Sequence, residues 1–326
     1  MPAHSGLSVP TTVNPFELKP LSFSWRDRLK MTVVGVVLFP ARAIALVSSM
    51  VGIATISYVC TIGHDEAKPL PPWRRALITP IQPLARIILW SLGFWRIKVT
   101  RMAGSAPPGG MGVLAAAPHF SLMDPIVLAW LELPCSVSKK EVRALPVVGS
   151  VAAALQCIFV NRKDPESKRK TAHAIIERGQ SAAAGGSEAW PPVLVFPEGT
   201  CTNGRALISF KAGAFLPGVP VQPVALRYLH GEHGLSLAAC TDEAESRLLY
   251  AMLQLSNSLE VIYLPLHHPS KGEVDDKALF AASVRDELAA HLEVRTRDSN
   301  PRPLPRTLAA PLALPTLAGA HHGALV

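Results

Sequence analysis

Residues 117–125 read Ala117-Pro118-His119-Phe120-Ser121-Leu122-Met123-Asp124-Pro125, a stretch that places a histidine and an aspartate in apolar surroundings. The residues before it, 111–117, form a continuous apolar run typical of a short buried strand, and Pro118 ends that run. We therefore expect His119 at the end of a strand, where a helix begins. Asp124 should follow about one and a half helical turns later.

A carboxylate at this spacing can reach the imidazole, fix its tautomer and stabilise the imidazolium form. A histidine needs this support if it is to take a proton from a hydroxyl group. His119 and Asp124 would then be the base half of a catalytic triad that has no obvious serine. The spacing fits an ordinary buried histidine beside an N-terminal helix cap equally well.

Basic residues follow two strands expected further along the chain. Residues 157–160 predict a strand that ends at Arg162, at the edge where open α/β sheets bind their ligands. Arginine can hold a phosphate group through two parallel hydrogen bonds. Residues 135–138 predict another strand that leads to Lys139 and Lys140. These lysines suit either a phosphate group or a solvated turn.

A second turn with ligand-binding character follows the buried strand predicted over residues 192–196. Gly199 allows the backbone to come close to a ligand, while Glu198 and Thr200 supply an acceptor and a donor. A carboxylate suits the hydroxyl groups of a ligand, and backbone N–H groups suit a phosphate. Lys211 is a further basic point that can face a phosphate.

These blocks, taken in order, resemble the glycerolipid acyltransferases that esterify lysophosphatidic acid and related lysophospholipids. The resemblance covers residues 14–269, and residues 196–203 and 210–215 resemble the lysophosphatidylcholine acyltransferase branch. The matching blocks are His119 with Asp124, residues 158–162 (Ile-Phe-Val-Asn-Arg), residues 195–200 (Val-Phe-Pro-Glu-Gly-Thr) and residues 219–224 (Val-Pro-Val-Gln-Pro-Val).

The resemblance implies an α/β fold like that of glycerol-phosphate acyltransferases, with a mixed central sheet, flanking helices and membrane-embedded helices before it. It implies transfer of an acyl group from acyl-CoA to a lysophospholipid, with lysophosphatidylcholine as the expected acceptor. His119 would be the base and Asp124 would orient it. Neither a metal nor a cofactor is expected. The residues expected to bind substrate are Arg162, Glu198, Gly199, Thr200, Lys211 and Pro223.

Alternatives to this function remain open at the level of sequence. The acceptor can instead be lysophosphatidic acid, or the chain can be a membrane lipid-binding protein without turnover. Cys201 beside the binding turn can act as a nucleophile that carries the acyl group. Pro223 lies in residues 219–228, a predicted strand whose prolines argue against a regular ladder and favour an apolar wall for an acyl chain.

The composition favours a lipid surface as partner. Apolar residues make up 49% of the 326 residues, the mean hydropathy is +0.26 and the formal charge is +8. Only 17% of residues are charged and no basic-aromatic motif is present, so we expect no nucleic acid. The five cysteines are scattered without metal-ligand spacing, so we expect reduced thiols that face a reducing compartment.

The expected organisation has four parts. Residues 1–25 are a mobile tail in which Asn14-Pro15-Phe16 is a candidate docking point. Residues 26–95 are membrane-embedded and interfacial helices, residues 96–294 the acyltransferase domain and residues 295–326 a flexible tail. Residues 163–178 predict a solvated surface helix. By resemblance, the membrane is that of the endoplasmic reticulum.

Two features of residues 26–95 stay open. Residues 43–62 are long and apolar enough to span a bilayer, but Arg42 beside Pro40 also fits two half-length helices that enter and leave one leaflet. Residues 81–95 fit either a helix in the membrane interface or an amphipathic core helix.

Overall fold

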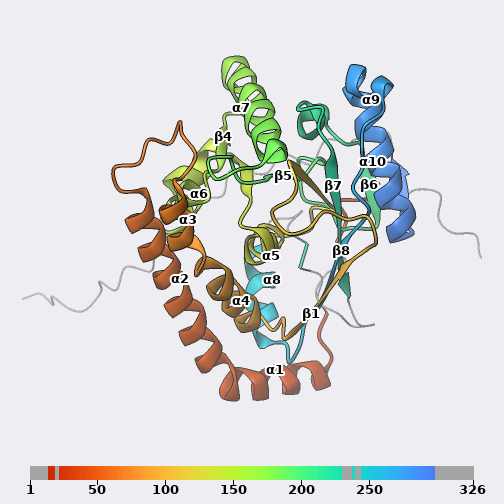
Figure 1. Ribbon diagram of the computed structural model, residues 1–326. Helices are drawn as coiled ribbons and strands as arrows, with labels where there is room; N and C mark the ends of the chain where they lie inside the picture. Colours follow the sequence, from red (N-terminus) through yellow and green to blue (C-terminus); the bar gives the residue numbers. More distant parts are fainter. Residues whose placement is uncertain (1–13, 19–21, 230–236, 239–243, 298–326) are drawn as a thin grey trace, which may run out of the picture.

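The centre of the fold is a seven-stranded sheet in the order β1-β8-β7-β2-β5-β3-β4 (Figure 1). The structure is a computed structural model that describes residues 14–18, 22–229, 237–238 and 244–297, so Cys240 and most of the two expected tails lie outside the described residues. Only β7 and β8 pair antiparallel, which makes the sheet mixed, as predicted. Its strands are β1 (Arg96–Arg101), β2 (Val113–Ala117), β3 (Cys135–Lys139), β4 (Ile158–Val160), β5 (Val193–Val195), β7 (Val221–Leu229) and β8 (Ser258–Tyr263).

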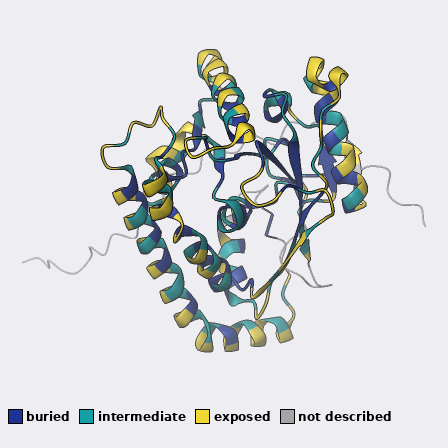
Figure 2. Ribbon diagram, in the orientation of Figure 1, coloured by how far each residue is buried: buried dark blue, intermediate teal, exposed yellow. Residues whose placement is uncertain are grey.

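The central strand β2 is buried on both faces because its side chains are apolar and mostly small. Leu114 and Ala116 pack into one core, whereas Val113, Ala115 and Ala117 pack into the other. A continuous apolar run of this kind is typical of parallel strands that are covered by helices on both sides. The sheet accordingly appears as the dark, buried middle layer of the molecule (Figure 2).

Helices cover both faces of this sheet. One face packs against α2, α4, α5 and α6, and the opposite face packs against α7 and α10. The helices are α1 (Trp25–Val37), α2 (Phe39–Thr61), α3 (Pro72–Ile78), α4 (Ile81–Ser91), α5 (Met123–Glu132), α6 (Val148–Ala154), α7 (Pro165–Ala184), α8 (Ala244–Leu253), α9 (Lys271–Asp275) and α10 (Lys277–Leu292), with short 3-10 turns η1 (Lys140–Ala144) and η2 (Ala212–Phe215).

Helices α1 and α2 meet at an angle and wrap one side and one end of the domain (Figure 1). The helix break lies at Leu38, so Arg42 lies inside the continuous helix α2. The region thus forms two helices that separate two residues before Pro40, and the proline itself lies in the first turn of α2, where a missing N–H costs no helical hydrogen bond. Among the described helices, α2 alone is long and apolar enough to cross a membrane, with 23 residues and a mean hydropathy of 1.9.

Arg42 is fully buried and holds α2 against the end of α8. Its Nη1 donates to the carbonyl oxygens of Met252 at 2.5 Å and Gln254 at 2.6 Å, and Nη2 donates to that of Leu255 at 3.0 Å. The last carbonyl groups of a helix lack intrahelical partners and carry partial negative charge. The guanidinium group therefore satisfies the end of a helix that lies far away in the sequence.

Helix α4 is a core helix and not an interfacial one. Ile81, Ala85, Ile88 and Leu89 are buried, and α4 lies between α2 and α5. Its only arginine, Arg86, donates to the carbonyl groups of Phe94 and Trp95. The core-helix alternative is thus the one that the structure supports for residues 81–91.

The strand β7 keeps a regular register with β2 through Pro223, which pairs with Ala115. The expectation that proline excludes a ladder here is wrong, for a directional reason. The carbonyl group of Pro223 accepts from Leu264 N at 3.1 Å, on the β8 side of the strand. In a strand, the N–H and the carbonyl group of one residue point to the same side, so the N–H that Pro223 lacks would also face β8. There it lies beyond Val224–Tyr263, the last residue pair between β7 and β8, and the hydrogen bonds between β7 and β2 therefore lose no donor.

A small second sheet differs from the expected C-terminal tail. Strand β9 (Arg295–Arg297) pairs parallel with β6 (Ala206–Ile208), so the first residues assigned to that tail belong to the folded domain. The pairing joins the end of the described chain to the segment that follows the Glu198 turn.

The buried contact of Arg42 yields a stability prediction. Arg42→Ala should lower the free energy of unfolding by about 2 kcal/mol or more, because three carbonyl groups at the end of α8, one of them in a buried hydrogen bond, lose a charged donor. Thermal unfolding of the purified protein in detergent micelles measures the effect. Arg28→Ala, at an exposed position of α1, is the matched control and should change little. Equal midpoints for the two variants would contradict the capping role.

Candidate active site

His119 and Asp124 lie in direct contact at the carboxyl end of β2. His119 Nδ1 is 2.8 Å from Asp124 Oδ2, and the imidazole stacks on the ring of Phe196 with centroids 4.0 Å apart. Residues 118–122 form a loop and α5 begins only at Met123, so His119 and Asp124 are brought together by this loop and not by helical spacing. Because Asp124 occupies Nδ1, Nε2 is the ring nitrogen that remains for other partners.

The carboxylate of Asp124 is completely buried and has four hydrogen-bond donors. Besides His119, Oδ2 accepts from Phe120 N at 2.6 Å and Ser121 N at 2.9 Å, and Oδ1 accepts from Tyr228 Oη at 2.5 Å. Burial raises the pKa of Tyr228, and the charge of Asp124 raises it further, so the phenol keeps its proton and acts as a donor. A buried charge is stable only when it is partnered in this way.

Glu198 is also buried, and it points into the protein. Its Oε1 accepts from the backbone N–H of His119 at 2.8 Å, and Oε2 accepts from Thr202 Oγ1 at 3.3 Å. Burial is the main reason why the pKa of Glu198 rises, to about 7, although the His119 N–H and imidazole oppose the rise. The glutamate turn therefore holds the backbone of the histidine turn.

His119 opens into a cavity of about 680 Å³ at the carboxyl ends of β2, β5, β3 and β4. Apart from His119, four charged side chains line this cavity, and all four are basic. None of the carboxylates in the described residues forms an ion pair with any of the four. The basic residues are Lys139, Arg162, Lys168 and Lys211. A cavity of this kind suits a ligand that carries several negative charges.

Arg162 and Lys211 meet over Gly199. Arg162 Nη1 donates to the carbonyl oxygen of Gly199 at 2.9 Å. Burial lowers the pKa of Lys211, and the charge of Arg162 lowers it further. Gly199 has φ +68°, and a Cβ atom there would lie 2.5 Å from Lys211 Nζ, so a side chain at this position would displace the lysine.

The pKa of His119 reflects two opposed effects. Burial, the largest of them, lowers it, but hydrogen bonds and charge interactions with Asp124 and Cys201 together raise it above its ordinary value. The imidazolium form is therefore favoured at neutral pH. The ion pair between His119 and Asp124 makes its full contribution to the stability of the fold when the pH is below the ordinary pKa of histidine. This contribution is lost as the pH rises through the raised pKa of His119.

The acyltransferase family model matches residues 82–227, which include the whole of this site. Lysophosphatidylcholine acyltransferase 2 of Rattus norvegicus is 36% identical over 310 residues, covering 91% of this chain and 54% of the relative. The chain belongs to the acyltransferase family. Lysophosphatidylcholine acyltransferase of Drosophila melanogaster is 35% identical over 291 residues, covering 88% of this chain and 53% of the relative. The chain thus spans about half the length of the curated relatives that it matches.

The fold of this chain is also similar to a solved structure. The 1-acyl-sn-glycerophosphate (LPA) acyltransferase of Thermotoga maritima aligns with a TM-score of 0.51, covering 84% of this chain and 98% of that one. The two sequences are only 17% identical, so the comparison supports the α/β fold alone.

The fold brings most of the predicted site residues to one place. His119, Arg162, Gly199, Thr200 and Lys211 line the cavity, and Asp124 lies directly behind His119.

The other two predicted binding residues differ from expectation. The carboxylate of Glu198 faces inward because the His119 N–H and the Thr202 hydroxyl satisfy it there. Pro223 is buried in β7 and is not among the residues that line the cavity.

Some residues of the site escaped prediction from the sequence. Tyr228 and Ser121 support Asp124, but nothing in the sequence marks a tyrosine more than a hundred positions away as its partner. Thr202 is bonded to both site loops, since its N–H donates to His119 O at 2.8 Å. The threonine lies inside the resembling block 196–203, which was the available signal.

Asn203 joins the site to the N-terminal segment. Its Nδ2 donates to the carbonyl oxygens of Asn14 at 2.7 Å and Glu17 at 2.8 Å, and its N–H donates to that of Pro15 at 2.7 Å. Its Oδ1 accepts from Arg205 N at 3.0 Å. Asn14-Pro15-Phe16, predicted only as a docking point, thus docks on the loop next to Glu198. For residues 14–18 the structure differs from the expected mobile tail.

The raised pKa of His119 predicts how its ring reacts. Diethyl pyrocarbonate attacks only neutral imidazole, so the modification rate of His119, followed by peptide mass spectrometry, should have a midpoint above the ordinary value of about 6.5. Asp124→Asn should move that midpoint down, because the partner charge is lost. Identical midpoints in the two proteins would show that Asp124 does not raise the pKa.

The contacts of Asn203 predict a local loss of order. Asn203→Ala should accelerate amide hydrogen exchange in residues 14–18 and 198–205. The substitution removes the two side-chain hydrogen bonds to the N-terminal segment and the one to Arg205 N. Asn161→Ala is the control, since Asn161 Oδ1 accepts only from the nearby Lys163 N. The role of Asn203 fails if both variants exchange at the wild-type rate.

Proposed function

We propose that the chain is an acyl-CoA-dependent acyltransferase that esterifies the free hydroxyl group of a lysophospholipid, with lysophosphatidylcholine as its acceptor. The observation that carries the proposal is the His119–Asp124 pair at one end of a cavity whose other charged groups are all basic. The acceptor class comes from relatives about 36% identical that are named lysophosphatidylcholine acyltransferases.

The chemistry is direct acyl transfer. His119 Nε2 takes the proton of the acceptor hydroxyl, and the oxygen attacks the thioester carbon to form a tetrahedral oxyanion. The carbon–sulfur bond then breaks, and the coenzyme A thiolate leaves and recovers the proton from the imidazolium. The products are the diacyl phospholipid and free coenzyme A. This scheme needs neither a metal nor a cofactor, and no covalent intermediate.

Each other group has a physical task in this scheme. Arg162 and Lys211 hold the acceptor phosphate beside Gly199, where the backbone can approach closely. Thr200 lines the same end of the cavity and offers a hydroxyl group. Glu198 positions His119 through its backbone N–H and does not bind substrate hydroxyls.

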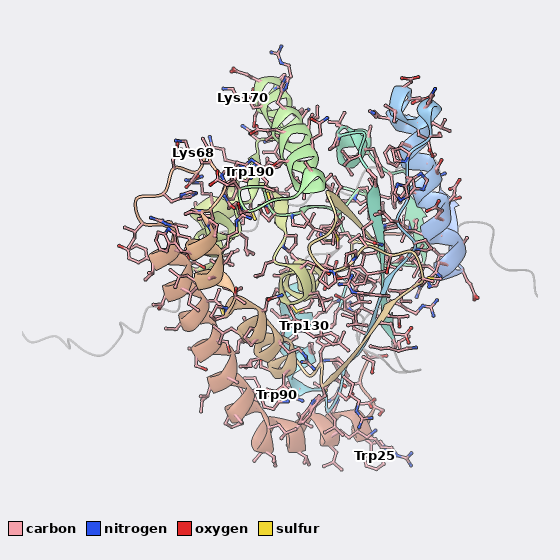
Figure 3. All side chains as sticks on the ribbon, viewed as in Figure 1. Trp25, Lys68, Trp90, Trp130, Lys170 and Trp190 are labelled. Carbon is pink, nitrogen blue, oxygen red and sulfur yellow. The ribbon has the colours of Figure 1, made fainter. Side chains whose placement is uncertain are left out.

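A lipid surface is the expected location because the outer faces of α1 and α2 are apolar and exposed. Trp25 lies at the end of α1, at the foot of the molecule (Figure 3). Since α2 packs along α3, α4 and α6, a crossing by α2 alone would separate it from the domain. We therefore favour α1 and α2 embedded in one leaflet, at the endoplasmic reticulum. Large apolar side chains exposed on these helices are Trp25, Leu29, Val33, Val36, Val37, Ile44, Val47, Val51, Tyr58 and Val59.

A second candidate rests on Cys201, whose thiol interacts with His119 and lines the cavity. The sequence showed no histidine placed to activate this thiol, but the structure supplies His119 itself. Cys201 would then take the acyl group from coenzyme A and pass it to water or to the acceptor. Such a route requires an acyl-enzyme and a burst of coenzyme A release.

Direct transfer predicts different results for the two residues. His119→Ala should lower kcat by roughly 10²-fold or more, the usual size of a lost general base, whereas Cys201→Ala should keep most activity. The assay follows labelled acyl groups from acyl-CoA to lysophosphatidylcholine, lysophosphatidic acid and lysophosphatidylethanolamine with purified protein. His173→Ala, on the exposed side of α7, is the control. If the wild type shows a burst of coenzyme A release and the Cys201→Ala variant is inactive and shows none, the covalent route is favoured.

A further inference from the structure

The side chain of Tyr228 extends from β7 to the buried carboxylate of Asp124. Tyr228 Oη donates to Asp124 Oδ1 at 2.5 Å, while His119 Nδ1 contacts the other oxygen, Oδ2, at 2.8 Å. The phenol and the imidazole therefore lie on different oxygens of one carboxylate. Tyr228 is not among the residues that line the cavity, so it reaches the site through Asp124 and not through a bound substrate.

The direction of the hydrogen bonds around this phenol follows from the number of protons. A phenol has one proton to donate, and an ionised carboxylate has none. The proton of Tyr228 therefore points to Asp124, and in the contact between Ser121 Oγ and Tyr228 Oη at 3.4 Å the serine is the donor. Ser121 Oγ also accepts from Met123 N at 3.1 Å, which fixes this hydroxyl. Serine and tyrosine thus form a chain of donors that ends on the carboxylate.

Aromatic packing holds the phenol in this position. Its ring stacks on Phe120, with centroids 4.6 Å apart and an interplanar angle of 15°, and Phe120 belongs to the loop that carries His119. The fully buried ring of Phe94 meets it nearly at a right angle, with centroids 6.1 Å apart. Tyr228→Phe would keep both ring contacts and remove only the hydroxyl group.

This hydroxyl opposes the effect of Asp124 on the imidazole. A carboxylate favours the imidazolium form of a neighbouring histidine, and a donor on its other oxygen offsets part of that negative charge. Among the described residues, Tyr228 is the one side chain besides His119 that donates to Asp124. Cys201 and Glu198 also face His119, the thiol through the ring and the carboxylate through the backbone N–H. The other charged groups in the cavity are the basic side chains Lys139, Arg162, Lys168 and Lys211.

We propose that Tyr228 is a positioning residue that lowers the proton affinity of His119 by sharing the charge of Asp124, and so keeps the imidazole available as a base. The inference rests on the proposed function, because a base must be neutral before it can take the proton of the acceptor hydroxyl. Without the phenol, Asp124 would hold more of His119 as imidazolium at neutral pH. The phenol keeps its own proton, so the scheme gains no further proton transfer.

Tyr228→Phe tests the role of the hydroxyl group without turnover. In this variant, the midpoint for modification of His119 by diethyl pyrocarbonate should rise by about half a pH unit or more, because the charge of Asp124 is less offset. Tyr263→Phe removes another buried phenol from the same sheet, and this matched control should have the wild-type midpoint. An unchanged or lower midpoint in Tyr228→Phe would overturn the inference.

Turnover gives a second measurement, one that a purely structural role would not move in the same way. At pH 7, Tyr228→Phe should lower kcat roughly threefold or more, the change that corresponds to half a pH unit. The KM values for acyl-CoA and lysophosphatidylcholine should stay unchanged, because Tyr228 does not line the cavity. The deficit in kcat should shrink as the pH rises, since a higher pH restores the neutral imidazole.

The pH dependence separates the possible outcomes. A deficit in kcat that is the same at every pH would show that the hydroxyl group only supports the packing, and would overturn the inference. If the wild type transfers no acyl group but the modification midpoint still rises in Tyr228→Phe, the proposed function fails and the effect of Tyr228 on the proton affinity of His119 stands.

Discussion

The buried carboxylate of Asp124 is the constraint on which the rest of the site depends. A charge with no solvent access is tolerated only when donors surround it, and its donors come from the histidine turn and from Tyr228 on β7. The carboxylate therefore fixes three things together: the loop after β2, the first turn of α5 and the neighbouring strand. The imidazole is oriented because the loop that carries it is tied to the same two oxygens. Phe120 adds an apolar contact, stacking on Tyr228 with ring centroids 4.6 Å apart.

A second layer of contacts supports this first one from the other loop. Glu198 accepts the N–H of His119, Thr202 donates to the carbonyl group of His119, and Asn203 fastens the N-terminal segment to the same loop. The two loops leave adjacent parallel strands, β2 and β5, so their meeting follows from the topology of the sheet. Residues 14–17 thus help to support a site whose histidine lies about a hundred residues further along the sequence.

Much of this arrangement follows from local pattern. Apolar runs that end in proline or in polar residues predicted the strands, and the strand ends predicted where His119, Arg162 and Gly199 would gather. The sequence does not show which way a side chain turns. Glu198 looked available to a ligand, but its carboxylate faces inward, where the His119 N–H and the Thr202 hydroxyl donate to it. Tyr228 and Asn203 act through partners distant in sequence, so only the folded chain shows their roles. The charge of Arg42 suggested two half-length helices because its acceptors lie at the end of α8, far away in the sequence.

The balance of effects on His119 links the chemistry to the lipid surface. Burial lowers the pKa of the imidazole, while Asp124 and Cys201 raise it, and the second effect is the larger one. An apolar group that enters the cavity removes water from around the ring, which strengthens the first effect and favours the neutral base. The cavity can admit such a group because its lining combines apolar side chains with four basic ones. The polarity of a bound ligand therefore helps to set whether the imidazole of His119 is charged or neutral.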